Sequence, residues 1–281
     1  MFIPITFASC PVAFDSTTKT FLELLIKLTI SFDPINHNKT SYLVLQSHIL
    51  NGLGKYDEAV KTIDNAIDLV PTLNSLYARK SYLLITSQRE SEALNLIDEL
   101  LENHPSLKQS LLKQKSYVQV ALKQYEEGLK TVDEGIELDP NDIAFINNKA
   151  MILGYLGRRE EAIETAEYLI RLNPRNGNSY DTYGEVLMVL GEYENAIEKL
   201  KEALNLEPTG WFAFATCLKM VECFKELGKF EKAIEYYEKG KKLTEKMHPS
   251  ERETYKEKYL PKAEKMISEI RALLGDSNIN E

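Results

Sequence analysis

Prolines recur at a nearly constant interval through the middle of the sequence. The intervals are 34, 35, 34 and 34 residues, between Pro71, Pro105, Pro140, Pro174 and Pro208. Proline cannot continue an α-helix, because it lacks the backbone N–H and its ring clashes with the preceding turn. Each proline therefore predicts the end of one helical unit and the start of the next. A period of this length predicts a stack of repeated units rather than one central core.

Two series of small residues share this period. One lies twelve residues before each proline and continues into a sixth unit, at Ala59, Ala93, Gly128, Ala162, Ala196 and Ala233. The other lies in the first half of each unit, at Ser47, Ser81, Ser116, Ala150 and Gly184. Small side chains are needed where two helix axes approach closely, because larger groups would push the helices apart. Each unit is therefore predicted to be a pair of helices that cross at these positions.

Glycines mark the predicted turn between the two helices in four of the units. They are Gly54, Gly157, Gly191 and Gly228, and glycine is the residue expected just past a helix end. The second unit has Gln88 at this position, so we expect a less regular turn there. The sixth unit has three more residues before its turn than the fifth, which predicts a first helix longer by about one turn.

These spacings resemble the tetratricopeptide repeat, a pair of antiparallel helices of 34 residues. The resemblance covers roughly residues 38 to 243. In the clearest unit it is carried by Tyr180, Tyr183, Gly184, Leu187, Gly191, Tyr193, Ala196, Leu200, Ala203 and Pro208. The resemblance implies an all-α fold: an α-solenoid in which helix-turn-helix repeats form a right-handed superhelix, with a C-terminal capping helix.

The same reasoning divides the chain into four parts. Residues 1–37 form an N-terminal segment with an irregular start, broken by Pro4 and Pro11, and a capping helix. Residues 276–281 are predicted to be a disordered tail. Residues 249–275 form the C-terminal capping helix, which starts at a capping box of Ser250 and Glu253. Residues 38–248 hold six repeats, at about 40–71, 74–105, 109–140, 143–174, 177–208 and 214–245.

Composition argues against several classes of function. A formal net charge of −9 disfavours nonspecific binding to nucleic acid. No apolar run reaches the roughly 18 residues of a membrane helix, so no membrane-spanning segment is expected. The three cysteines and four histidines are scattered, which indicates neither a disulfide framework nor a metal site and fits a cytoplasmic chain. Sequence motifs for phosphate loops, nucleophile elbows and metalloproteases are absent, so we expect neither enzyme activity nor a cofactor.

The family resemblance implies that the first helix of each repeat lines a concave groove for a protein or peptide partner. Amides there can bond a peptide backbone, tyrosines and methionine can hold apolar side chains, and charges can select between sequences. We therefore expect a non-enzymatic protein–protein interaction module that acts as an adaptor or assembly scaffold. The alternative is that these residues are solvated or contact one another within the array. The candidate partner-binding residues are His48, Arg79, Tyr82, Lys113, Tyr117, Asn147, Asn148, Met151, Asp181 and Glu185.

One specialised role within this family can be compared residue by residue. Co-chaperones of the family hold a C-terminal carboxylate with a clamp of two lysines, two asparagines and one arginine. Lys113 and Asn148 match that clamp. Tyr117, Asn178 and Thr182 stand where it has Asn, Lys and Arg. The missing cations are those that neutralise the carboxylate, so we do not expect a standard heat-shock-protein tail-binding role.

Two hypotheses of other kinds stay open. The run from Phe7 to Cys10 faintly resembles a lipoprotein processing box, which would make the chain a membrane-tethered protein of envelope assembly. Alternatively, the end helices could dock between copies and make the chain a self-associating structural module. The sequence predicts neither the oligomeric state nor the identity of the partner.

Overall fold

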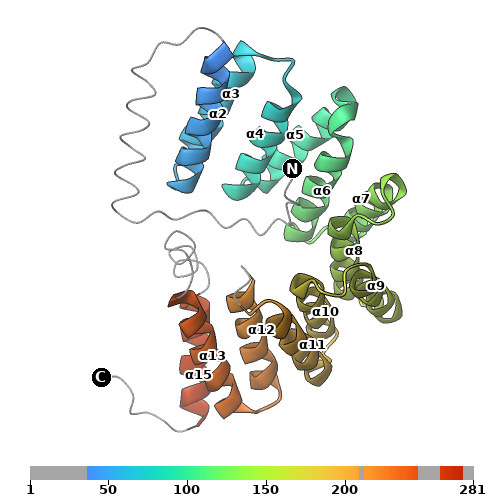
Figure 1. The fold of residues 1–281 in the computed structure, drawn as a ribbon, viewed down its shortest axis with the longest axis vertical. Helices are drawn as coiled ribbons and strands as arrows, with labels where there is room; N and C mark the ends of the chain where they lie inside the picture. Colours follow the sequence, from blue (N-terminus) through green and yellow to red (C-terminus); the bar gives the residue numbers. More distant parts are fainter. Residues whose placement is uncertain (1–36, 209–211, 246–259, 275–281) are drawn as a thin grey trace. The chain divides into compact units, whose positions relative to one another are not determined.

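The protein is an all-α solenoid in which consecutive helices pack as pairs (Figure 1). The computed structural model describes residues 37–208, 212–245 and 260–274, and these ranges contain helices and turns but no β-strand. Several predicted features lie outside the described residues. They are the N-terminal capping segment, the first part of the predicted C-terminal helix up to residue 259, and the predicted tail.

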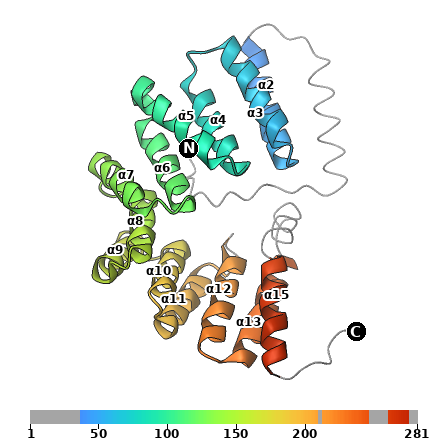
Figure 2. The same ribbon diagram turned by 180° about the vertical axis from the view of Figure 1, so that it is seen from behind.

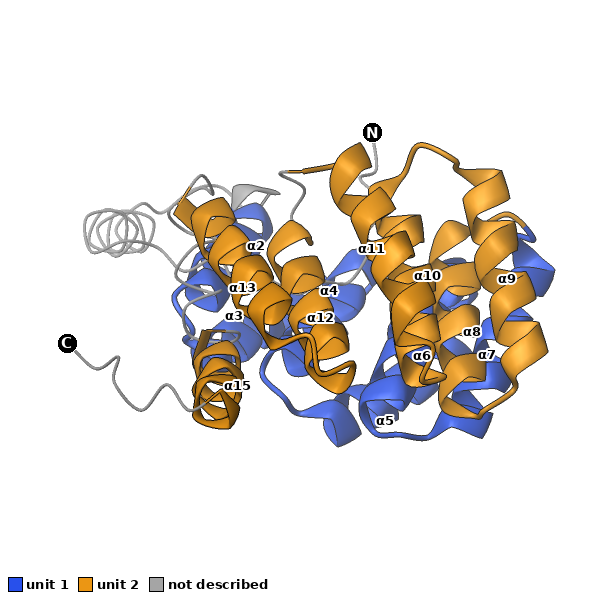
Figure 3. Ribbon diagram, turned by 90° about the horizontal axis from the view of Figure 1, so that it is seen from below, with its two compact units in different colours: residues 1–140, 249–253 blue, residues 141–248, 254–281 orange. Residues whose placement is uncertain are grey.

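The chain forms two compact units, coloured separately in Figure 3. Unit 1 comprises Met1–Pro140 with Pro249–Glu253, and unit 2 comprises Asn141–His248 with Thr254–Glu281. The helices of unit 1 are α2 (His37–Gly52), α3 (Tyr56–Leu69), α4 (Asn74–Thr86), α5 (Glu90–Asn103), the short 3₁₀ helix η1 (Pro105–Leu107), α6 (Lys108–Ala121) and α7 (Tyr125–Leu138). Those of unit 2 are α8 (Ile143–Tyr155), α9 (Arg159–Leu172), α10 (Gly177–Val189), α11 (Tyr193–Leu206), α12 (Ala213–Glu226), α13 (Phe230–Glu245) and α15 (Leu260–Leu273).

Each repeat is one helix pair, which can be followed from both sides in Figures 1 and 2. We call α2, α4 and α6 the first helices of unit 1, and α8, α10 and α12 the first helices of unit 2. Their partners α3, α5, α7, α9, α11 and α13 are the second helices. Every second helix except α13 ends shortly before a proline of the 34-residue series, as the loss of the N–H donor requires.

The small residues lie where the paired helices cross. The alanines of the second-helix series are fully buried, and so are the serines and alanine of the first-helix series. Gly184 shows why size matters: a Cβ atom at this position would lie 2.7 Å from the Leu200 side chain of the paired helix. The crossing therefore fixes the spacing of the pair, as the sequence predicted.

The turns inside the repeats share one conformation, whether or not they contain glycine. The four glycines have φ between 66° and 79°, and Gln88 and Lys123 have φ of 59° and 58°. At Gln88 the turn closes with a hydrogen bond of 2.9 Å from the Arg89 N–H to the Leu84 carbonyl. The expectation of a less regular turn at Gln88 was therefore wrong, because the helix-capping bonds impose the left-handed conformation on a non-glycine residue.

The sixth repeat differs from its expected form. Its first helix, α12, has 14 residues against 13 in α10, so the extra turn predicted for it is not present. Two of the three additional residues precede the helix, and one lengthens it. Phe212 and Phe214 are buried.

The C-terminal helix α15 packs against α13. Ala263, Met266, Ile267 and Ile270 form its buried face, whereas Leu273 is 65% exposed. Pro261 lies in the first turn of α15, where a missing N–H is tolerated. The apolar face of α15 therefore covers the last helix pair.

Candidate functional site

Polar side chains connect the first helices within unit 1. The Thr86 hydroxyl on α4 donates to Asn51 Oδ1 on α2 over 2.9 Å. On the other side of α4, the Ser81 hydroxyl donates to Gln114 Oε1, and Gln114 Nε2 donates to the Ala78 carbonyl over 3.3 Å. These bonds hold α2, α4 and α6 side by side, and Asn51 and Gln114 are buried in making them.

Arg79 on α4 is the most unusual residue of this surface. Its Nε and Nη2 atoms are buried without a hydrogen-bond partner. Its guanidinium carbon lies 5.1 Å from the centre of the Tyr82 ring, one helical turn away, a distance at which cation–π attraction acts. Burial lowers the pKa of Arg79 to about 10, so the side chain remains a cation at neutral pH.

His48 on α2 lies close enough to Arg79 to be affected by its charge. Desolvation, and then the positive charge of Arg79, lower the pKa of His48 to about 4, although part of the residue is exposed. His48 is therefore neutral at pH 7 and can accept or donate a hydrogen bond. Lys113 and Tyr117 on α6 are half-buried.

In unit 2, hydrogen bonds within the chain occupy Asn147 and Asp181, two of the predicted partner-binding residues. Asn147 Oδ1 on α8 accepts a hydrogen bond from the Thr182 hydroxyl on α10. Asp181 on α10 is buried and accepts a hydrogen bond of 2.6 Å from the Thr216 hydroxyl on α12. The same pairing thus recurs 34 residues later, and it connects successive first helices rather than facing a partner.

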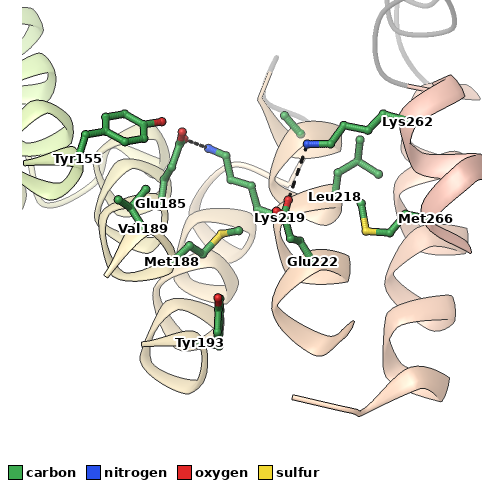
Figure 4. A pocket seen from close by; sticks show the side chains of 11 residues that line it. Tyr155, Glu185, Met188, Val189, Tyr193, Leu218, Lys219, Glu222, Lys262 and Met266 are labelled. Atoms are coloured by element: carbon green, nitrogen blue, oxygen red, sulfur yellow. Dashed lines mark ion pairs between the residues drawn. The ribbon is translucent and has the colours of Figure 1, made fainter. Parts of the chain in front are cut away.

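Lys219 on α12 completes a charged cluster with two acidic residues of α10. Its Nζ lies 2.7 Å from Asp181 Oδ2. It also forms an ion pair with Glu185, which Figure 4 marks with a dashed line. Burial alone would lower the pKa of Lys219, but the two carboxylates outweigh burial and raise the pKa above its ordinary value. Lys219 is therefore a fully compensated cation. Asn148 and Met151 are half-buried on α8.

A cavity of about 380 Å³ lies beside this cluster, within unit 2. Figure 4 shows side chains from α8, α10, α11, α12 and α15 converging on it. Its walls are mainly apolar, and Glu185, Lys219 and the Glu222–Lys262 pair, at 3.9 Å, supply the charges. The apolar lining residues are Tyr155, Met188, Val189, Tyr193, Ala215, Leu218 and Met266.

Of the ten candidate partner-binding residues, Glu185 lines this cavity. Met188 and Val189 follow Glu185 by one helical turn on α10, so extending the predicted face by one turn would have identified them. Leu218 and Lys219 belong to the sixth repeat, whose spacing is irregular. Met266 comes from α15, and no periodic signal connects that helix to the others.

The described residues give no sign of metal or membrane chemistry. No group of three His, Cys, Asp or Glu side chains in the described ranges is placed to hold a metal ion. None of the described helices is both long and apolar enough to cross a membrane. Cys217 and Cys223 on α12 are buried free thiols, and burial raises their pKa to about 11 and about 12.

Solved structures of low sequence identity share the fold. A tetratricopeptide repeat protein from Parabacteroides merdae ATCC 43184 is 16% identical, with a TM-score of 0.69 over 90% of this chain and 91% of that chain. A thermophilic protein of the same class from Thermus thermophilus is also 16% identical, with a TM-score of 0.54 over 67% of this chain and 98% of its own. No curated protein matches the sequence.

Sequence models of one family match several parts of the chain. Models described as tetratricopeptide repeat match residues 147–210, and residues 40–72 and 215–247. The matched segments fall in both units and coincide with helix pairs. With the fold described above, these matches show that the chain belongs to the tetratricopeptide repeat family.

Proposed function

We propose that the protein is a non-enzymatic adaptor or assembly scaffold that binds a partner peptide on the side formed by its first helices. Arrays of stacked helix pairs offer extended surfaces of this kind, and they bind protein partners in general. The observation that carries the proposal is the cavity of unit 2, because it is built by three successive first helices together with α11 and α15.

The size and lining of the cavity suit one large apolar side chain of a peptide. Ligand pockets usually measure roughly 300 to 1,000 Å³ and combine apolar walls with a few polar groups. Here the volume is about 380 Å³. Met188 and Met266 can adjust to different apolar side chains, because methionine is flexible and polarizable. Glu185 and Glu222 can hold a basic or amide group next to that side chain.

The other predicted residues enter this proposal with different roles. Tyr82, Lys113, Tyr117, Asn148 and Met151 are half-buried on first helices and stay candidates for partner contact. Asn147 and Asp181 bond the neighbouring first helix, so we assign them a positioning role. A cytoplasmic location fits the two free thiols of α12. The lipoprotein alternative depends on Cys10, which lies outside the described residues.

A selected peptide and two matched variants test the cavity. Peptides that bind the full chain are first selected from an array, and we expect them to share a Leu, Met or Phe residue. Val189→Asp should then weaken binding by about tenfold or more, because it places a charge in the apolar wall. Leu206→Asp is the control, since Leu206 is 40% exposed, Val189 is 37% exposed, and Leu206 lies on α11 away from the cavity. Equal affinity of the two variants would show that the cavity is not the binding site.

A further inference from the structure

We propose that Asn176 is a site of self-modification, at which the side-chain amide is lost through a cyclic imide formed with Gly177, and that Glu207 suppresses this reaction in the folded chain. The inference goes beyond the proposed function, because it concerns the chemistry of the junction between α10 and α11. Only its consequence for partner binding rests on the proposed function.

The chain contains the dipeptide Asn-Gly at two places, Asn51–Gly52 and Asn176–Gly177. Asparagine followed by glycine is the pair most prone to deamidation, because glycine has no side chain to hinder its own backbone nitrogen. Asn51 lies in the last turn of α2 and is 8% exposed. Asn176 directly precedes α10 and is half-buried. The second pair is therefore the more accessible of the two.

The packing of unit 2 requires glycine at position 177. A Cβ atom there would lie 2.8 Å from Cζ of Phe212 and 2.9 Å from the Ala203 carbonyl oxygen. The asparagine has a structural role as well. Asn176 Oδ1 accepts a hydrogen bond of 2.9 Å from the Ser179 N–H and caps α10. A reactive pair is therefore built into this junction.

The reaction is an attack by one backbone nitrogen on the preceding side chain. The Gly177 nitrogen bonds to Cγ of Asn176, the Cγ–Nδ2 bond breaks, and the proton of the Gly177 nitrogen leaves with Nδ2 as ammonia. Water then opens the five-membered imide at one of its two carbonyl carbons. Opening at Cγ gives aspartate, and opening at the backbone carbonyl carbon gives isoaspartate, in which the chain continues through the side chain.

Three features of the folded chain oppose this attack. The backbone of Asn176 is extended, with φ −93° and ψ 109°, which turns the Gly177 nitrogen away from the side-chain carbon that it would attack. Asn176 Oδ1 is held at the first turn of α10 by the N–H and the hydroxyl of Ser179. The Gly177 N–H donates to Glu207 Oε1 over 2.9 Å. The imide ring can close only after these hydrogen bonds are released.

Glu207 connects this restraint to the paired helix. It is the C-cap residue of α11 and is half-buried, so its carboxylate joins the start of α10 to the end of α11. A charged acceptor makes a stronger hydrogen bond than a neutral one. Release of the Gly177 N–H therefore requires a local opening of the α10–α11 pair, and deamidation proceeds at the frequency of that opening.

The two products should affect unit 2 differently. Aspartate caps a helix as well as asparagine does, and its charge suits the start of a helix, so α10 should persist. Isoaspartate adds a carbon atom to the backbone beside Gly177, where Phe212 and the Ala203 carbonyl leave no room for one. Phe212 directly precedes α12, which forms one wall of the cavity. Isoaspartate should therefore disturb the cavity and weaken partner binding in aged protein.

The test follows deamidation of the full chain and of two Glu207 variants during storage at mildly alkaline pH. Peptide mass spectrometry measures the rate at each Asn-Gly pair. Glu207→Ala should speed deamidation of Asn176 at least about tenfold, because losing a hydrogen bond to a charged group makes the opening that much more frequent. Glu207→Gln keeps an acceptor oxygen and should fall between the parent and Glu207→Ala. Asn51 is the internal control, and its rate should be the same in all three chains.

Two further measurements separate protection by Glu207 from a general loss of structure. In denaturant, the three chains should deamidate Asn176 at one common rate, because the protecting contacts are absent. Asn176→Asp should melt at the same temperature as the parent, whereas aged parent protein enriched in isoaspartate should melt earlier. This difference tests the assignment of the damage to the altered backbone and not to the new charge.

Three results would overturn the inference. One is a parent chain that deamidates Asn176 as fast when folded as in denaturant. Another is a Glu207→Ala chain that deamidates Asn176 no faster than the parent, or more slowly, as expected if the carboxylate acted as a base for the attack. The third is an equal acceleration at Asn51. A peptide array without any binding peptide would remove the proposed function but would leave these rates unaffected.

Discussion

Both units carry a largely buried cation on their first-helix side, but only unit 2 provides carboxylates for it. Lys219 pairs with Asp181 and Glu185 of the preceding first helix. Arg79 has Tyr82 and His48 as neighbours and no acidic partner in the described residues. The first helices of unit 2 contain three lysines and four acidic residues, whereas those of unit 1 contain no acidic residue. Both units thus have a cation on a first helix, but carboxylates compensate it in unit 2 and an aromatic ring contacts it in unit 1.

The largest effect expected is the loss of stability from removing the compensated cation. Lys219→Met leaves Asp181 and Glu185 without their counter-ion, and breaking a largely buried pair in this way costs on the order of 3 kcal/mol. The lower end of the usual range is appropriate because the Lys219 side chain is 20% exposed. Denaturant unfolding of Lys219→Met and Arg79→Met measures the contrast. Equal destabilisation by the two substitutions would remove the distinction between the two cations.

Overpacking the crossing of a helix pair should reduce the free energy of unfolding by a similar amount in both units. The two units are therefore expected to differ in their charges and not in their helix crossings. Ala196 in unit 2 and Ala93 in unit 1 are fully buried at the same position of the repeat. Substitution of either by leucine should cost roughly 1–3 kcal/mol, because the added atoms overpack the crossing. The midpoint of denaturant unfolding for the two variants provides the measurement. A variant that unfolds no earlier than the parent would contradict the assignment of this position to the crossing.

A pH effect should be confined to unit 1. The pKa of His48 is about 4 in the folded chain and 6.5 when unperturbed, so the unfolded chain binds a proton that the folded chain does not. Stability associated with neutral His48 is therefore present above pH 6.5 and is lost as the pH falls towards 4. Hydrogen exchange at pH 7 and pH 5 should show faster opening of α2 and α4 at pH 5. This difference should shrink in His48→Gln, while exchange in α10 and α11 serves as the internal reference.

The smallest effect is expected at the turns. Lys123 holds φ of 58° in unit 1, where unit 2 has glycine at Gly157, Gly191 and Gly228. Lys123→Gly should stabilise the chain by about 1 kcal/mol, because the left-handed conformation disfavours a residue with a Cβ atom. Gly157→Ala should destabilise by a similar amount. Denaturant unfolding measures both, and no difference between them would show that the turns are not strained in unit 1.

The sequence predicted the fold well because the fold depends on local, repeated features. Proline ends a helix wherever it occurs, and a small residue is required wherever two helices cross, so the periodic positions determined the helix pairs. The turn at Gln88 was misjudged because hydrogen bonds from neighbouring residues override its intrinsic preference. The length of α12 was misjudged because extra residues can precede a helix as easily as extend it.

The candidate site was harder to predict, since it depends on contacts between residues that are far apart in sequence. The phase of the repeat selected one side of the first helices as the candidate surface, with Arg79 and Glu185 among its residues. It could not show that Asp181 bonds Thr216 and Lys219 on the next first helix, or that α15 brings Met266 to the cavity. Those contacts depend on how successive helix pairs stack against one another. The spacing of similar residues along the sequence does not specify that stacking.

The reactivity of the two buried thiols of α12 can be used to measure how often this helix separates from its neighbours. The thiolate is the form that reacts with alkylating reagents, and burial keeps Cys217 and Cys223 protonated and out of contact with solvent. Both sulfurs can react only while α12 is transiently released from its neighbours. Replacing the third cysteine, Cys10→Ser, leaves only the two thiols of α12. The rate of alkylation of that variant would therefore measure the frequency of local opening at α12.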